Sequence, residues 1–134
     1  MIAPPEEFER LVTKYLGLLG IGHPWKVEVV VRTDPEESLV DPDDPDAYAA
    51  CSCLPEYYRA TLHFDALHES WQSVEAGDIE RCVRHEVLHI PLGILSCLAR
   101  DMLGGNTAAR EAIRQAEERV ATLLEFAPLW DQGG

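Results

Sequence analysis

The chain has 134 residues, 46% of them hydrophobic, and a formal net charge of −13. This length suits one domain with its own core, so we expect residues 1–134 to form a single domain. The acidic balance argues against a nucleic-acid partner, because phosphate backbones recruit basic surfaces. No apolar run reaches the length of a membrane span, and the N-terminus lacks a signal-peptide pattern. We therefore expect a cytoplasmic protein without a membrane partner.

The first half of the chain predicts one helix followed by strands. Pro5 with two glutamates behind it is typical of a helix start, and apolar residues recur at helical spacing up to Leu19, just before Gly20. Valine-rich or alternating segments then predict three strands, at residues 25–33, 47–54 and 57–64. In the last of these, Tyr58, Ala60, Leu62 and Phe64 are expected to share the core face. The acidic segment 34–46 between the first two strands predicts a solvated loop.

The second half predicts helices. A short helical stretch is expected at about residues 66–73, followed by a long helix from about residue 79 that Pro91 bends or ends. After a turn at Gly104-Gly105, a last helix is expected from about residue 108 to 126. The order of elements therefore predicts an α+β fold, with a small antiparallel or mixed sheet of about three strands.

The four cysteines do not form a zinc-ligand pattern. Cys51 and Cys53 make one C-x-C pair, but no second pair completes a four-cysteine site. Free cysteine is among the most frequently buried residue types, so we interpret Cys51, Cys53, Cys82 and Cys97 as packing thiols. A cytosolic setting also argues against structural disulfides.

The motif that carries chemistry is His85-Glu86-Val87-Leu88-His89, an HExxH sequence within the predicted long helix. Residues four apart lie about 40° apart around a helix axis, so both imidazoles leave one face and can share a metal ion. Neutral imidazole is a preferred Zn²⁺ ligand, and Glu86 is placed to take a proton from zinc-bound water. The alternative interpretation is an amphipathic helix with two incidental histidines and a surface glutamate.

A catalytic zinc ion commonly has three protein ligands, so a third must be found. The longer pattern HExxHxxGxxH is absent, because Leu92 and Leu95 stand at its glycine and third histidine. A glutamate of the last helix is the other option. On a helical wheel Glu117 lies within that helix's apolar stripe, which is formed by Ile113, Ala116, Val120, Leu123, Leu124 and Ala127.

The wheel therefore favours Glu117 as third ligand, with zinc compensating the charge of an inward-facing carboxylate. It places Glu111, Glu118 and Glu125 away from the stripe. Two questions stay open. Glu117 at the edge of the stripe would also be explained by pairing with an arginine, and a straight antiparallel hairpin leaves it one to two turns short of the histidines. The choice between Glu117 and Glu118 is therefore not closed by the sequence.

With these residues the chain resembles the gluzincin branch of the zincin metallopeptidases, and especially the single-domain minigluzincins and the short HExxH proteins of phages and prophages. The resemblance rests on His85-Glu86-Val87-Leu88-His89, on Glu117-Glu118-Arg119-Val120 and on the strand at residues 60–65. It implies a zincin-like fold and peptide-bond hydrolysis by zinc-bound water, with Glu86 as base and His85, His89 and Glu117 as zinc ligands. It also implies that the strand before the motif helix aligns the substrate through main-chain hydrogen bonds.

The resemblance further implies a tyrosine or histidine that stabilises the oxyanion. Tyr57, Tyr58 and His63 are guesses for this role, because they lie near the motif in the predicted order of elements. The expected partner is a peptide or protein substrate. An alternative function is a catalytically silent zinc-binding protein with a zincin fold, acting in interaction or regulation. A third is a protease-like regulator that docks on a host or partner protein before it cuts.

Overall fold

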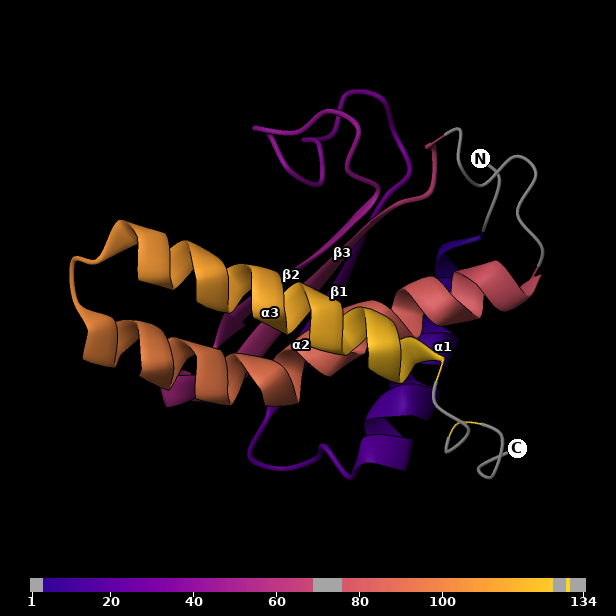
Figure 1. The fold of residues 1–134 in the computed structure, drawn as a ribbon. Helices are drawn as coiled ribbons and strands as arrows, with labels where there is room; N and C mark the ends of the chain where they lie inside the picture. The colour runs from indigo at the N-terminus through magenta and orange to yellow at the C-terminus, as the bar shows by residue number, and fades with distance from the viewer. Residues whose placement is uncertain (1–3, 69–75, 127–129, 131–134) are drawn as a thin grey trace.

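The computed structural model describes residues 4–68, 76–126 and 130. It is an α+β arrangement in which helices cover one face of a small mixed sheet (Figure 1). The elements are α1 (Pro5–Leu19), β1 (Lys26–Arg32), β2 (Ala49–Leu54), the 3-10 turn η1 (Pro55–Tyr57), β3 (Arg59–Asp65), α2 (Ala76–Leu103) and α3 (Thr107–Glu125). The predicted α+β class, with a small mixed sheet of three strands, is thereby confirmed.

The sheet has the strand order β1-β3-β2, with β3 parallel to β1 and antiparallel to β2. Leu62 in the middle of β3 is paired with Val29 on one side and Cys51 on the other. Both edges of β3 are therefore occupied by neighbouring strands. The expectation that the strand before the motif helix aligns a substrate is wrong for β3, because its backbone groups are already paired. Within the described part of the chain, β2 keeps one edge without a strand partner.

The core lies between the sheet and the helices α1 and α2. Ala60, Leu62 and Phe64 of β3 are buried on this face, as the alternation predicts, and Phe8 of α1 stacks on Phe64 with ring centroids 4.8 Å apart. Tyr58 does not join them. It precedes β3 in a left-handed backbone conformation (φ 52°) and is half exposed.

Helix α1 has the predicted bounds because its stop signal is local. Gly20 adopts φ 70°, a left-handed conformation that costs glycine little, and its N–H bonds back to the carbonyl of Gly17. The helical stretch predicted at residues 66–73 falls mostly outside the described residues, and residues 66 and 67 form a turn.

Helix α2 runs through Pro91 without ending. Proline removes one helical hydrogen bond, but packing against α1, β2 and α3 holds the helix on both sides of it. By length and composition alone, Ile79–Leu103 could cross a membrane. The core helix of a soluble protein passes the same test, and 44% of the tested window is buried in this fold.

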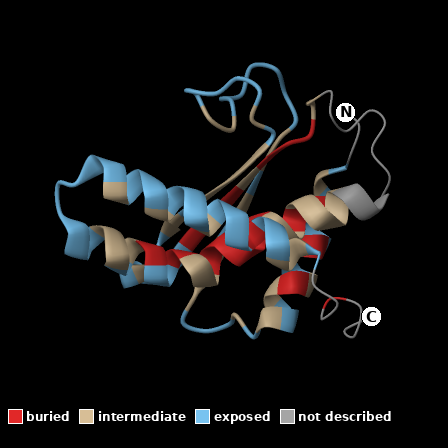
Figure 2. Ribbon diagram, viewed as in Figure 1, coloured by how far each residue is buried: buried red, intermediate tan, exposed pale blue. Residues whose placement is uncertain are grey.

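Helix α3 lies antiparallel beside α2 but faces it differently from the prediction (Figure 2). Ala121 is its buried residue, and Ile113, Glu117, Leu124 and Glu125 are half-buried. Three members of the predicted apolar stripe are exposed instead: Ala116, Val120 and Leu123, the last at 74%. Ala127 lies outside the described residues. The stripe does not predict the contact face, because Glu118 and Glu125, which lie outside it, contact the histidines of α2.

Candidate metal centre

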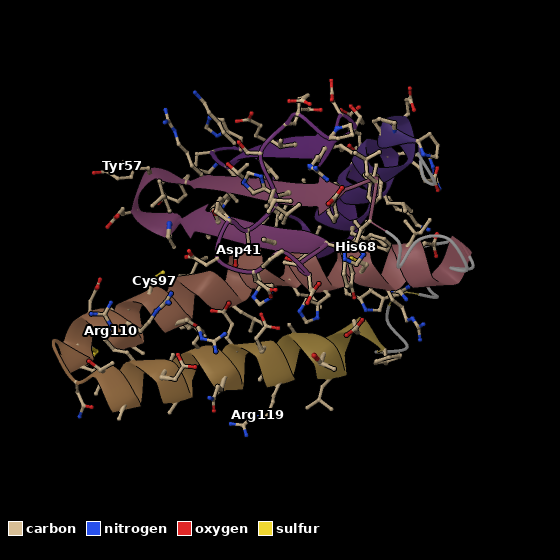
Figure 3. All side chains as sticks on the ribbon, turned by 90° about the horizontal axis from the view of Figure 1, so that it is seen from above. Asp41, Tyr57, His68, Cys97, Arg110 and Arg119 are labelled. Carbon is tan, nitrogen blue, oxygen red and sulfur yellow. The ribbon has the colours of Figure 1, made fainter. Side chains whose placement is uncertain are left out.

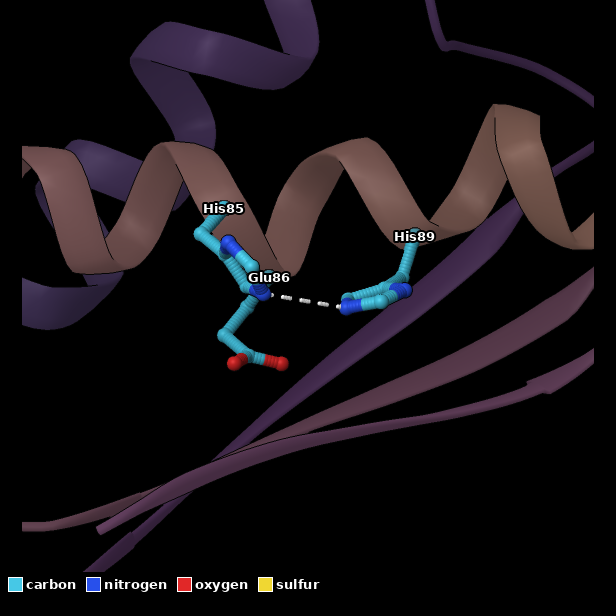
Figure 4. A group of neighbouring side chains, drawn as sticks. All are labelled: His85, Glu86 and His89. Atoms are coloured by element: carbon cyan, nitrogen blue, oxygen red, sulfur yellow. Dashed lines mark hydrogen bonds between the residues drawn. The ribbon is translucent and has the colours of Figure 1, made fainter. Parts of the chain in front are cut away.

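The two histidines of the motif leave one face of α2 and approach each other closely (Figure 4). Their Nε2 atoms lie 3.3 Å apart. Tetrahedral zinc with bonds of 2.0–2.1 Å would hold two nitrogens about 3.3 Å apart. The group His85, Glu86 and His89 offers ligand atoms that all lie within 4.8 Å of one another and could hold a metal ion. The predicted sharing of one helix face is therefore confirmed.

Glu118 of α3 lies across this pair of nitrogens. Its Oε2 atom is 3.0 Å from Nε2 of His85, and its Oε1 atom is 2.9 Å from Nε2 of His89. The side chain is 48% exposed, so it closes the pair from the solvent side. The wheel's placement of Glu118 away from the site is wrong, because the inward face of α3 is rotated relative to its apolar stripe.

Two further glutamates of α3 contact the other ring nitrogens. Glu117 Oε2 lies 2.5 Å from Nδ1 of His89, and Glu125 Oε1 lies 3.3 Å from Nδ1 of His85. Glu125 was also expected to face away, but it stands seven residues after Glu118, which is within about 20° on a helix. The predicted shortfall in register does not occur, since the described hairpin brings Glu117 against His89.

These Nδ1 contacts determine the tautomer and the orientation of the two imidazoles. A carboxylate at Nδ1 accepts a hydrogen bond from it, which leaves the Nε2 lone pair of the neutral ring directed at the shared site. Burial disfavours the charged form of His89, but the Glu117 hydrogen bond and the carboxylates of Glu86 and Glu118 outweigh it and raise its pKa. For Glu117, burial is outweighed by hydrogen bonds from His89 and Ser96, and its pKa is lowered.

Glu86 is the deepest acid of the cluster, with 8% of its surface exposed. Figure 4 shows its carboxylate on the side of α2 that faces the strands. Burial raises the pKa of Glu86 to about 7, against the opposing effect of His89 and His85. A carboxyl group with this pKa exchanges protons near neutral pH, as a general base does.

The charge balance of the cluster fits a cation. Four carboxylates, those of Glu86, Glu117, Glu118 and Glu125, surround two imidazoles. Within the described residues, the ion pairs of the three α3 glutamates are all made with His85 and His89. A divalent ion between the Nε2 atoms would supply positive charge at the centre of this cluster, in addition to the charge of Arg100, which acts on Glu117, and that of Arg114, which interacts with Glu118.

Open space flanks Glu86 on both sides, between α2 and the free edge of β2. One pocket of about 320 Å³ is lined by Tyr48, Ala49, Cys82, His85, Glu86 and Glu125, together with Ala47. A second, of about 370 Å³, lies toward the C-terminal half of α2 and is lined by Ala49, Cys51, Glu86, His89 and Glu118 among others. The two pockets share Ala49 and Glu86 and therefore adjoin along β2; we refer to them together as the groove.

None of the guessed oxyanion residues lines this groove. Tyr57 is 68% exposed at the far end of the sheet (Figure 3), and Tyr58 packs its ring edge against Trp25. His63 lies with Val30 on the sheet face opposite the core. Tyr48, at the start of β2, was not singled out and does line the groove, with its ring 5.3 Å from that of His68.

Sequence alone gave no reason to select Tyr48, because its position depends on how β2 pairs with β3. Burial, and then the neighbouring Cys82, Glu86 and Glu125, raise the pKa of Tyr48. Its phenol therefore keeps its proton at neutral pH and can donate a hydrogen bond. All four cysteines are half-buried free thiols. Cys51 and Cys82 pack against the core, as their interpretation as packing residues predicts, whereas Cys53 and Cys97 line the groove.

Comparison of the chain with protein-family models, curated proteins and solved structures gives no match. The interpretation of the site therefore rests on its own residues and their geometry.

Proposed function

We propose that the chain is a zinc-dependent metallopeptidase of the gluzincin type. The observation that carries the proposal is the pair of Nε2 atoms of His85 and His89, 3.3 Å apart, with a buried glutamate beside them. A purely structural zinc site would not need Glu86, whereas a hydrolytic site needs a base next to the metal.

The proposed ligands are His85, His89 and Glu118. Two imidazole nitrogens and one carboxylate are a donor set typical of catalytic zinc, and they leave one position of a tetrahedron open. Glu118 is preferred to Glu117 because its oxygens lie at both Nε2 atoms. Glu117 and Glu125 would orient the histidines through Nδ1.

When bound, zinc would supply a water of lowered pKa and an electrophile for the scissile carbonyl. Glu86 would take the proton of the attacking water on its carboxylate and return it to the leaving amine nitrogen. Tyr48 would donate a hydrogen bond to the oxygen on which negative charge develops. Its place beside Glu86 in the groove supports this role.

The substrate would lie in the groove as an extended peptide added to β2. An edge strand offers unpaired N–H and C=O groups, and these bind a peptide backbone without regard to its side chains. The strand concerned is β2 rather than β3, since β2 lines the groove and, in the described part of the chain, has one edge without a strand partner.

A mixed peptide library tests the proposal. Zinc-loaded wild type should cleave library peptides, and Glu86→Gln, which keeps the side-chain shape but cannot accept the proton, should retain zinc and lose cleavage by at least about 100-fold. Glu111→Gln on the outer part of α3 is a matched control and should cleave normally. Equal cleavage by wild type and Glu86→Gln would contradict the assignment of the base.

A second candidate function is a silent zinc-binding interaction protein. The observation that favours it is an exposed apolar stripe on the C-terminal half of α2, formed by Leu95, Leu98 and Met102. Such stripes are typical of contact surfaces. Zinc binding at full occupancy, with no cleavage of any library peptide, would favour this candidate over the peptidase.

A further inference from the structure

The groove continues from Glu86 and His89 along the C-terminal half of α2, over a floor of small side chains. This floor is formed by Ala50, Cys51 and Cys53 of β2 and by Gly93 and Cys97 of α2. A Cβ atom at Gly93 would lie 3.3 Å from Sγ of Cys53, so glycine lets helix and strand approach closely. Charged side chains line the rest of this part of the groove, among them Glu117 and Glu118 of α3 and two arginines, Arg100 and Arg114.

Arg100 lines the far end of this groove. It stands eleven residues after His89, which is about three turns and within roughly 20° of the same helix face. Its side chain leans back toward the histidines: Nε donates to the carbonyl of Ser96, and Nη2 lies 3.2 Å from Sγ of Cys97. Figure 3 shows Cys97 on α2 near this end of the hairpin.

Arg100 differs from the other arginine of the groove in its partners. Arg114 makes a two-point ion pair with Glu111, at 3.0 and 2.5 Å. Within the described residues Arg100 makes no such two-point pair: its side-chain hydrogen bonds go to a carbonyl and a thiol, and its charge acts on Glu117 without a direct ion pair. A half-buried guanidinium has five N–H donors, so Arg100 keeps donors for a planar acceptor such as a carboxylate.

The position of the guanidinium sets the distance to the metal site. It lies near the level of Cys97, eight residues beyond His89, or about 12 Å along the helix. An extended peptide advances about 3.3–3.6 Å per residue, so this distance corresponds to about three residues. A carboxylate at that spacing from the cleaved bond would reach Arg100.

We propose that Arg100 forms an anion-binding subsite, which binds a peptide carboxylate about three residues from the bond that is cleaved. The inference rests on the proposed peptidase function. The carboxylate would come from an aspartate or glutamate side chain, or from the C-terminus of the substrate. Local recognition by one guanidinium is needed here because a chain of net charge −13 otherwise repels acidic peptides.

The direction of the bound peptide decides between the two sources. β2 runs alongside α2 in the same direction, since Tyr48 lies by His85 and Cys53 lies by Gly93. A peptide antiparallel to β2 would bring its N-terminal side to Arg100, and an acidic side chain would then be bound. A parallel peptide would bring its C-terminal carboxylate there.

The test measures peptide binding, so that it does not depend on turnover. Zinc-loaded Glu86→Gln protein is titrated into labelled alanine-rich peptides that carry glutamate, glutamine or lysine at one position, each with a free or an amidated C-terminus. We expect the peptide with the favoured carboxylate to bind about tenfold tighter than its neutral counterpart. Loss of affinity on amidation identifies the terminal carboxylate, and a glutamate preference that survives amidation identifies a side chain.

Variants of Arg100 in the same background separate recognition from folding. Arg100→Gln should abolish the preference, Arg100→Glu should turn it toward the lysine peptide, and Arg100→Lys should retain it in weaker form. Arg110→Gln is the matched control, because Arg110 is exposed and its Nη1 donates to the carbonyl of Gly104. A preference that is absent in the parent protein, or unchanged in Arg100→Gln, overturns the subsite.

The subsite and the peptidase fail in distinguishable ways. Cleavage of library peptides by wild type without any charge preference overturns the subsite and leaves the peptidase standing. Charge-selective binding that depends on Arg100, without cleavage by wild type, supports the subsite and contradicts the peptidase. Peptides that neither bind selectively nor are cleaved overturn both.

Discussion

The carboxylate of Glu117 lies 2.5 Å from Nδ1 of His89, the ring nitrogen that does not face His85. The next residue, Glu118, lies at Nε2 of the same ring. Two consecutive glutamates therefore contact opposite nitrogens of one imidazole. In the proposed site the first would orient the histidine, and the second would share the metal with it.

Exchange of these two glutamates for alanine should have unequal effects on zinc affinity. Loss of Glu117 removes a hydrogen-bond partner of a ligand, which typically costs about 10- to 100-fold in affinity. Loss of Glu118 removes a proposed ligand and should cost more than that. Competition titrations with a chromophoric chelator measure both, with Glu111→Ala as the control on the same helix. A larger loss in Glu117→Ala than in Glu118→Ala would contradict the proposed ligand set.

Metal content should follow the two motif histidines. The purified wild type should carry about one zinc ion per chain, because one pair of Nε2 atoms defines one site. The double variant His85→Ala, His89→Ala should carry almost none by elemental analysis. His63→Ala, on the opposite face of the sheet, should keep its zinc. Zinc that survives the double substitution would show that the metal binds elsewhere.

Tyr48→Phe should lower kcat far more than it raises KM. The phenol is proposed to donate a hydrogen bond mainly to the transition state, and loss of one such donor costs roughly 100-fold in kcat. Steady-state cleavage of a library-derived peptide measures the two constants. Tyr57→Phe is the control, since Tyr57 is exposed away from the groove. An unchanged kcat in Tyr48→Phe would remove this tyrosine from the mechanism.

The thiol of Cys53 should be protected from alkylation in a pH-dependent way. Burial, and then the nearby Cys97 and Glu117, raise its pKa from 9.0 to about 11. Only the thiolate reacts, so this raised pKa lowers the alkylation rate of Cys53 near pH 8 by about 100-fold relative to an ordinary thiol. The rate should rise about tenfold per pH unit until pH 11. Iodoacetamide labelling mapped by mass spectrometry checks this.

Unfolding provides the control for that experiment. In denaturant Cys53 is expected to react at the rate of an ordinary thiol, because the burial that raises its pKa is lost. Rapid labelling of Cys53 in the native protein at pH 8 would show that the gap between Gly93 and β2 opens readily.

Much of the fold could be predicted because its signals are local. Pro5 and Gly20 mark the ends of α1, and alternation in β3 identifies Leu62 and Phe64 as core residues. The pairing of the strands could not be predicted in the same way. β3 is the last strand in the chain but lies between β1 and β2 and pairs with both, and no local pattern of residues contains that order.

The candidate site likewise has a part that local sequence predicts and a part that it does not. The HExxH spacing by itself determined that His85 and His89 share one face of a helix, because the period of 3.6 residues is a local property. Only the tertiary structure decided which carboxylates of α3 meet them. The helical wheel assumes that apolar residues face inward, whereas Glu118 and Glu125 meet the histidines and Leu123 is exposed. Packing of α3 on α2 decides which face of α3 points at the histidines, and the pattern of apolar residues within α3 does not predict that face.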